Sequence, residues 1–102
     1  MIKVEIDYNC DQITSISIIG HGEGEKGYDL VCAGVSSCFV GAMNALEKID
    51  NYEILIESGN SSCKSKGKNP LHDQIVLETL VVQLYTISKE YPREVKVFKK
   101  GK

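Results

Sequence analysis

Two side chains of this chain have types and a spacing that suit nucleophilic chemistry. His21 follows an apolar run, and Cys32 lies 11 residues further along, after a stretch rich in glycine. A thiolate is a strong nucleophile, and an imidazole beside it can serve as the general acid that protonates a leaving amine. If the fold brings the two side chains together, the pair can carry out acyl transfer.

The residues around Cys32 predict how it would be activated. Asp29 precedes a run of apolar residues at three- and four-residue spacings, which predicts an N-cap and a helix over residues 29–50. Cys32 would then be the third helical residue, where unpaired backbone N–H groups favour a thiolate and could form an oxyanion hole. Asp29 could instead orient His21. Simple burial of Cys32 is the competing interpretation, because cysteine is among the most often buried residues. The spacing of His21 and Cys32 alone does not decide between a catalytic and a simply buried Cys32.

The remaining cysteines narrow the kind of chemistry further. Cys10, Cys38 and Cys63 form no C-x-x-C pair, and the chain has only two histidines, so we expect no metal site and no cofactor. A thiol peroxidase is another enzyme class that a reactive Cys32 would allow. It would need Cys38 or Cys63 to resolve the oxidised thiol, but Cys38 lies six residues along the predicted helix and on a different face.

A single small domain must position these side chains. The chain has 102 residues, of which 42% are hydrophobic, so we expect one domain over residues 1–102. Apolar periodicity predicts strands over residues 2–8, 13–19, 52–57 and 94–98 and helices over residues 29–50 and 70–91, while residues 58–69 have the composition of a loop. The order ββαβαβ indicates an α+β two-layer sandwich, with two helices on one face of a mixed four-stranded sheet.

Charge and hydropathy exclude some partners. The net charge is −2, so we do not expect direct nucleic-acid binding, although the last ten residues are rich in lysine. A ribosome-associated binding module that uses this tail and residues 58–69 is the non-catalytic alternative. No apolar run approaches the roughly 18 residues of a membrane span, and Met1 leads into an alternating strand pattern rather than the basic and apolar regions typical of a signal peptide. We therefore expect a cytoplasmic protein without membrane contact.

The sequence resembles the ribosomal-processing cysteine proteases known as Prp. The resemblance is carried by I-I-G-H-G at residues 18–22 and Y-D-L-V-C-A-G-V-S-S at residues 28–37, which look like that family's G-H and D-I-V-C-A-A-V-S blocks. It also covers the chain length and the predicted order of elements. Gly22 and Gly34 stand where the family often has alanine, and both replacements exchange one small residue for another.

The resemblance implies a cysteine endopeptidase that removes the N-terminal extension of a large-subunit ribosomal protein during ribosome maturation. The substrate would be an extended peptide with hydrophobic residues ahead of the scissile bond. His21 and Cys32 match the family's catalytic dyad. The residues that match the surrounding motif and would shape the site are Gly20, Gly22, Asp29, Ala33 and Ser36. The resemblance also implies a homodimer, whose interface could use the small residues of the first helix or the last strand.

Overall fold

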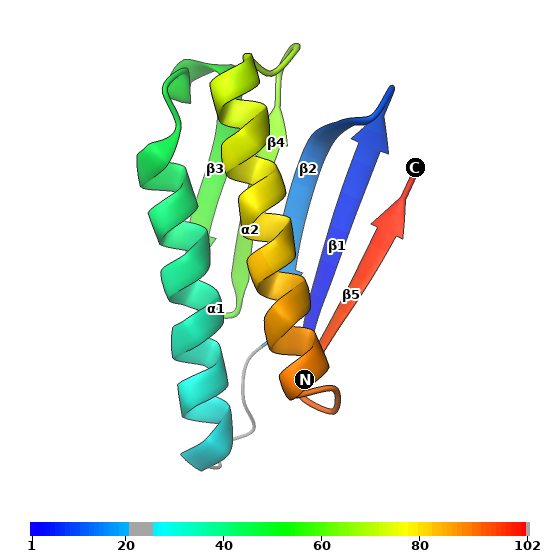
Figure 1. Cartoon of the computed structure of the whole chain (residues 1–102). Helices are drawn as coiled ribbons and strands as arrows, with labels where there is room; N and C mark the ends of the chain where they lie inside the picture. Colours follow the sequence, from blue (N-terminus) through cyan, green and yellow to red (C-terminus); the bar gives the residue numbers. More distant parts are fainter. Residues whose placement is uncertain (21–25, 102) are drawn as a thin grey trace.

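The structure, a computed structural model, describes residues 1–20 and 26–101, and for residues 26–29 it describes the backbone only. Figure 1 shows the arrangement of the helices and strands in that part of the chain. In chain order they are β1 (Ile2–Asn9), β2 (Gln12–Ile19), α1 (Lys26–Ala45), the short 3-10 helix η1 (Ile49–Asn51), β3 (Tyr52–Glu57), β4 (Asn60–Ser65), α2 (Leu71–Glu90) and β5 (Val95–Lys100).

The strands form one mixed sheet in the order β3-β4-β2-β1-β5. β1 pairs antiparallel with β2 and parallel with β5, and β4 pairs antiparallel with both β2 and β3. The predicted α+β class and mixed sheet are confirmed. The predicted count of four strands and the order ββαβαβ are wrong, because residues 58–69 contain β4 and the described elements run ββαββαβ.

β4 lacks the apolar alternation by which a strand is recognised in a sequence. It reads N-S-S-C-K-S, and Cys63 is its one buried apolar side chain. The strand is held instead by its position, because β2 and β3 hydrogen-bond to its two edges. A polar strand that is stabilised by its neighbours leaves almost no trace in composition.

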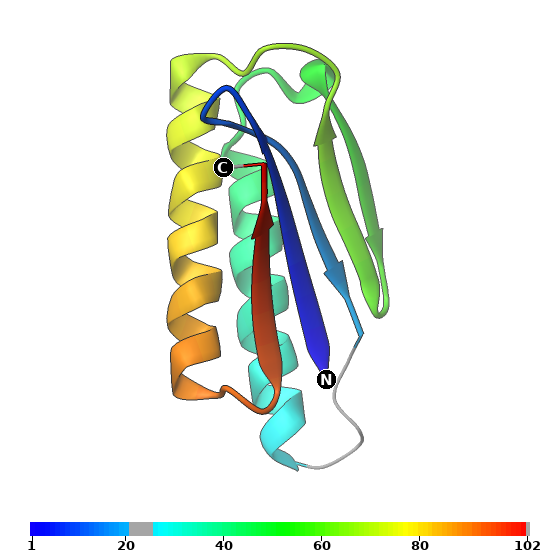
Figure 2. The ribbon, with the colours of Figure 1, turned by 90° about the vertical axis from the view of Figure 1, so that its right-hand side faces the viewer.

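Both helices cover the same face of the sheet, and the opposite face is open (Figures 1 and 2). Alternate strand residues such as Val4, Ile6 and Ile16 point toward the helices and are fully buried. Phe39 of α1 and Leu84 of α2 complete this layer. Each such side chain stabilises the fold by about 1.5–3 kcal/mol. This is the predicted two-layer arrangement, and within the described ranges neither helix is long and apolar enough to cross a membrane.

The first helix begins earlier and ends earlier than the sequence predicts. It starts at Lys26, so Asp29 lies within its first turn and is not the N-cap. Cys32 is therefore the seventh helical residue, in the second turn. At that depth the backbone N–H is paired within the helix and the dipole effect has largely decayed. The predicted activation of Cys32 by an open helix start is wrong.

A buried carboxylate explains why this helix ends at Ala45 rather than near residue 50. Asp73 of α2 is fully buried and accepts hydrogen bonds from the backbone N–H groups of Glu47 and Lys48, at 2.8 and 3.1 Å, and from the Tyr52 hydroxyl at 3.0 Å. Burial alone would raise the pKa of Asp73, but these three hydrogen bonds outweigh it and lower the pKa. The carboxylate thus fixes the chain between α1 and β3.

The second helix runs from Leu71 to Glu90, within one residue of its predicted bounds at each end. Pro70, with φ −61° and ψ 156°, occupies the N-cap position, and its side chain makes no capping bond. Asn69, one residue earlier, is buried, and its side-chain amide donates to the Ile13 carbonyl oxygen at 2.7 Å. His72 is exposed, with Nε2 3.0 Å from the Ala45 carbonyl oxygen.

Candidate active site

Cys32 lines a small hollow between α1 and one end of the sheet. The hollow has a volume of about 160 Å³, and the Cys32 side chain is partly buried against the core. Three parts of the chain contribute to its wall, namely the end of β2 with Ile18 and Gly20, the second and third turns of α1 with Cys32, Val35 and Ser36, and the β3–β4 turn from Glu57 to Ser61. Cys32 therefore borders a recess whose wall contains both apolar and polar residues.

Gly20 connects this hollow to the predicted histidine. It has a φ of +104°, and its N–H donates to the Gly59 carbonyl oxygen at 2.9 Å. A Cβ at this position would overlap the carbonyl oxygen of Met1 and lie 3.2 Å from the Met1 carbonyl carbon. Only glycine fits this position without strain, because L residues rarely adopt such a φ and the space is filled. Gly20 thus joins the end of β2 to the β3–β4 turn.

His21 and Gly22 lie outside the described residues. The residue directly before His21 lines the same hollow as Cys32, and 11 positions separate the two predicted dyad members in the sequence. The pairing of His21 with Cys32 stays a prediction.

The other predicted site residues divide into two groups. Ser36 is exposed and lines the hollow one turn after Cys32. Ala33 is exposed and is not part of the lining. Asp29 has helical backbone, and its side chain lies outside the described part of the chain. The structure therefore brings Gly20, Cys32 and Ser36 together.

The β3–β4 turn is the part of the site that the sequence reasoning missed. Ser58 and Gly59 form a two-residue turn, with Gly59 at a φ of +73°. Ser61 stands opposite Ile18 in register, and because Ile18 is buried under the helices, the Ser61 side chain also points to the helix side. A Ser-Gly pair between I-L-I and a second extended run is a hairpin signal that could have located this turn.

The other cysteines occupy different surroundings. Cys10 is exposed at the β1–β2 turn, and Cys38 lines a groove between α1 and α2. Cys63 is buried on β4, and burial, with a further contribution from the charge of Asp73, raises the pKa of its thiol to about 11. A thiol with that pKa is a poor nucleophile at neutral pH. Among the four cysteines, Cys32 alone lines the hollow at the end of β2.

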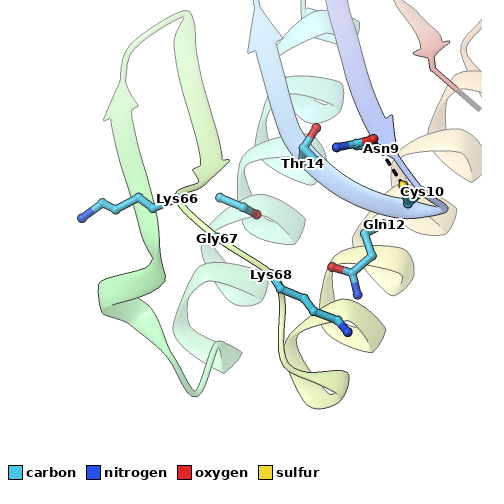
Figure 3. Close-up of a pocket in the computed structure, with 8 residues that line it drawn as sticks. Asn9, Cys10, Gln12, Thr14, Lys66, Gly67 and Lys68 are labelled. Atoms are coloured by element: carbon cyan, nitrogen blue, oxygen red, sulfur yellow. Dashed lines mark hydrogen bonds between the residues drawn. The ribbon is translucent and has the colours of Figure 1, made fainter.

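A larger hollow lies at the opposite end of the sheet. It has a volume of about 640 Å³ and is formed by the β1–β2 turn and by the segment that follows β4 (Figure 3). Cys10 and Lys68 border it, together with amide and hydroxyl side chains. It meets β2 at Gln12 and Thr14, whereas the Cys32 hollow meets that strand at Ile18. The larger hollow is therefore separate from the candidate site.

Comparison with known proteins finds relatives over nearly the whole chain. Residues 1–96 match the family described as cysteine protease Prp. The chain is 34% identical to the ribosomal processing cysteine protease Prp of Staphylococcus aureus, covering 95% of this chain and 97% of the relative, and 31% identical to that of Bacillus subtilis, covering 95% and 96%. A crystal structure of the S. aureus protease with a substrate peptide superposes with a TM-score of 0.86 at 31% identity, covering 98% of this chain and all of the other.

Proposed function

The chain belongs to the cysteine protease Prp family, and on this premise we propose that it removes the N-terminal extension of a large-subunit ribosomal protein, with Cys32 as nucleophile and His21 as its acid–base partner. The chain is a cysteine protease by family. A non-catalytic ribosome-binding module, the alternative that the sequence left open, does not fit this membership. Neither does a thiol peroxidase.

One observation supports the assignment of the reaction to Cys32 and His21. Cys32 and Gly20, the residue before His21, line one hollow at the end of β2. Two related crystal structures support the choice of substrate class, because the S. aureus protease has been solved with a substrate peptide and with a covalently linked product peptide, at 31% and 32% identity to this chain. A covalently linked product is what a cysteine nucleophile leaves behind.

The proposed reaction follows from these groups. The Cys32 sulfur attacks the carbonyl carbon of the scissile peptide bond, and an S–C bond forms while the C–N bond breaks. His21 takes the thiol proton and passes it to the departing amine. Water then attacks the thioester, with His21 as the base, and releases the N-terminal product as a carboxylic acid while the proton returns to sulfur.

The charge that develops on the carbonyl oxygen needs donors from the hollow. The backbone N–H groups at the start of α1 cannot serve beside Cys32, since the helix begins six residues earlier. The Ser61 hydroxyl belongs to the polar wall of the hollow and points to the helix side. We assign the Ser61 hydroxyl as one donor to the oxyanion.

Turnover of a synthetic peptide tests the proposed function. The peptide spans the N-terminal extension of the large-subunit ribosomal protein from the same organism. We expect the wild-type protein to cleave it at one bond, and Cys32→Ser and His21→Ala each to lose about 10³-fold or more in kcat while remaining folded. Cys38→Ser is the matched control, since its thiol lies in the groove between the helices. Full activity in Cys32→Ser would remove Cys32 from the mechanism.

The homodimer also remains a proposal for this chain. Sedimentation equilibrium over a range of protein concentrations would measure it directly. A monomer at all concentrations would contradict this part of the proposal without touching the chemistry.

A further inference from the structure

The two edge strands of the sheet differ in how they are protected. β5 carries lysines at positions 96, 99 and 100, and charged residues of this kind discourage another strand from pairing. β3, at the other edge, reads Y-E-I-L-I-E and has neither lysine nor proline. An exposed apolar edge strand attracts further strands, and peptide-binding domains use such edges to hold extended ligands.

The backbone of β3 has hydrogen-bonding groups at this open edge. The Asn51 carbonyl oxygen accepts from the Lys66 N–H at 2.7 Å, so Asn51 turns its backbone groups toward the segment that continues β4. Successive residues of an extended strand turn these groups to alternate sides. Counting from Asn51, Ile54 and Ile56 turn their N–H and C=O groups away from β4. They can therefore pair with an added chain.

The side chains of β3 are also suited to an extended peptide. Ile56 faces the helix side, opposite Ser61, and is 55% exposed, and Leu55 on the other face is 37% exposed. Glu53 and Glu57 lie on the same face as Leu55, and both are exposed. The edge thus offers apolar contacts on both faces and two negative charges on the open face.

The position of this edge links it to the candidate nucleophile. Glu57, the last residue of β3, lines the hollow that holds Cys32. A chain laid along β3 would therefore pass directly into that hollow. We propose that β3 is the substrate-docking edge of this protease, where an extended peptide pairs as a sixth strand and delivers its scissile bond to Cys32. This inference rests on the proposed function.

The geometry also specifies the chemistry of the peptide. Side chains of an added strand alternate between the two faces of the sheet. Those on the helix side meet Ile56, which favours apolar residues at every second position. On the open face, one peptide side chain lies beside Leu55, and the side chains two positions before and after it lie near Glu53 and Glu57. The two negative charges favour a basic residue at each of those outer positions. The fitting occupant is an extended peptide in which apolar residues alternate with polar or basic ones.

Ile56→Lys tests this edge, because it places there the charge that β5 already carries. With the ribosomal-extension peptide as probe, we expect KM to rise about tenfold or more with kcat changed less than threefold, since several contacts of the docked strand are lost. Phe98→Lys on β5, where the native side chain is 44% exposed, is the matched control and should leave KM unchanged. Circular dichroism confirms folding, and Ile56→Val should restore wild-type KM.

A second measurement uses the peptide and does not depend on the variant. In the inactive Cys32→Ser protein, N-methylation of alternate peptide amides should weaken binding in an every-second-residue pattern, because only one set of amides faces β3. Unchanged KM in Ile56→Lys together with a uniform N-methyl profile would overturn the docking edge and leave the proposed function standing. Binding along β3 without any cleavage by the wild-type protein would instead refute the proposed function. If sedimentation equilibrium finds a dimer for the wild type and a monomer for Ile56→Lys, a second copy of the chain occupies the edge, which also overturns the inference.

Discussion

Replacing Gly20 with alanine should disturb both stability and activity, because this residue ties the end of β2 to the β3–β4 turn. The added Cβ would overlap the carbonyl oxygen of Met1, and the φ of +104° is one that alanine rarely adopts. Met1 cannot move aside easily, since the neighbouring Ile2 is buried and its N–H donates to the Glu94 carbonyl oxygen at 2.7 Å. The variant must therefore either keep the unfavourable φ at residue 20 or rotate that residue to another φ.

The magnitude follows from these two routes. Retaining the φ costs about 1–3 kcal/mol. Turning the residue forfeits the 2.9 Å hydrogen bond to Gly59, worth about 0.5–1.5 kcal/mol, and displaces the chain that leads to His21. The lower entropy of the unfolded alanine chain returns about 0.4–1 kcal/mol. We expect Gly20→Ala to lower the free energy of unfolding by about 1–2 kcal/mol, within the range that single substitutions commonly produce.

Urea denaturation followed by circular dichroism measures this change, and peptide turnover measures the effect on the site. Gly41→Ala is the matched control, since Gly41 lies in α1 and a Cβ there has no neighbour within 4 Å. That substitution should raise the free energy of unfolding by up to about 1 kcal/mol through helix propensity. A Gly20→Ala protein as stable and active as the wild type would refute the reasoning about the strand end.

Two further substitutions test other parts of the structure. Asp73→Asn should lower the free energy of unfolding by about 2–4 kcal/mol, because an amide cannot replace the charged acceptor of three hydrogen bonds. The pKa of Asp73 is lower in the folded protein than in the unfolded chain, so the carboxylate stabilises the fold fully above the unfolded pKa. This stabilisation is lost as the pH falls from about 4 through the folded pKa. Urea titrations at several pH values should show this loss in the wild type and not in Asp73→Asn. Ser61→Ala should lower kcat about 10²-fold if its hydroxyl binds the oxyanion, whereas Ser62→Ala, on the open face, should have no effect on kcat.

The strands that alternate in hydrophobicity were predictable, and the one that does not was missed. The predicted bounds of β3 match the observed ones, because large apolar residues occupy the alternate positions 52, 54 and 56. The sequence of β4 predicts a loop, because its serines match a turn composition and Cys63 is its one buried apolar side chain. A strand without apolar alternation cannot be identified from its own residues.

The sequence singles out Cys32 and His21 as candidates, but it does not predict where the helix that carries Cys32 begins. Cys32 could be singled out by its spacing from His21 and by the surrounding motif. The early start of α1 could not be predicted, because Asp29 has the chemistry of a cap, whereas the segment before it is dominated by glycine and charged residues. The role of the β3–β4 turn depends on which hairpin meets the end of β2, and only the sheet order reveals that.

Intact-mass spectrometry of the reacting enzyme tests the central claim most directly. The wild-type protein is mixed with the ribosomal-extension peptide, quenched in acid within the first turnover, and digested to locate any adduct. We predict a mass increase equal to the N-terminal product less one water, carried on Cys32 as a thioester and absent from Cys32→Ser. Cleavage that proceeds without any adduct on Cys32, or an adduct on Cys10, Cys38 or Cys63, would contradict the assignment of Cys32 as the nucleophile.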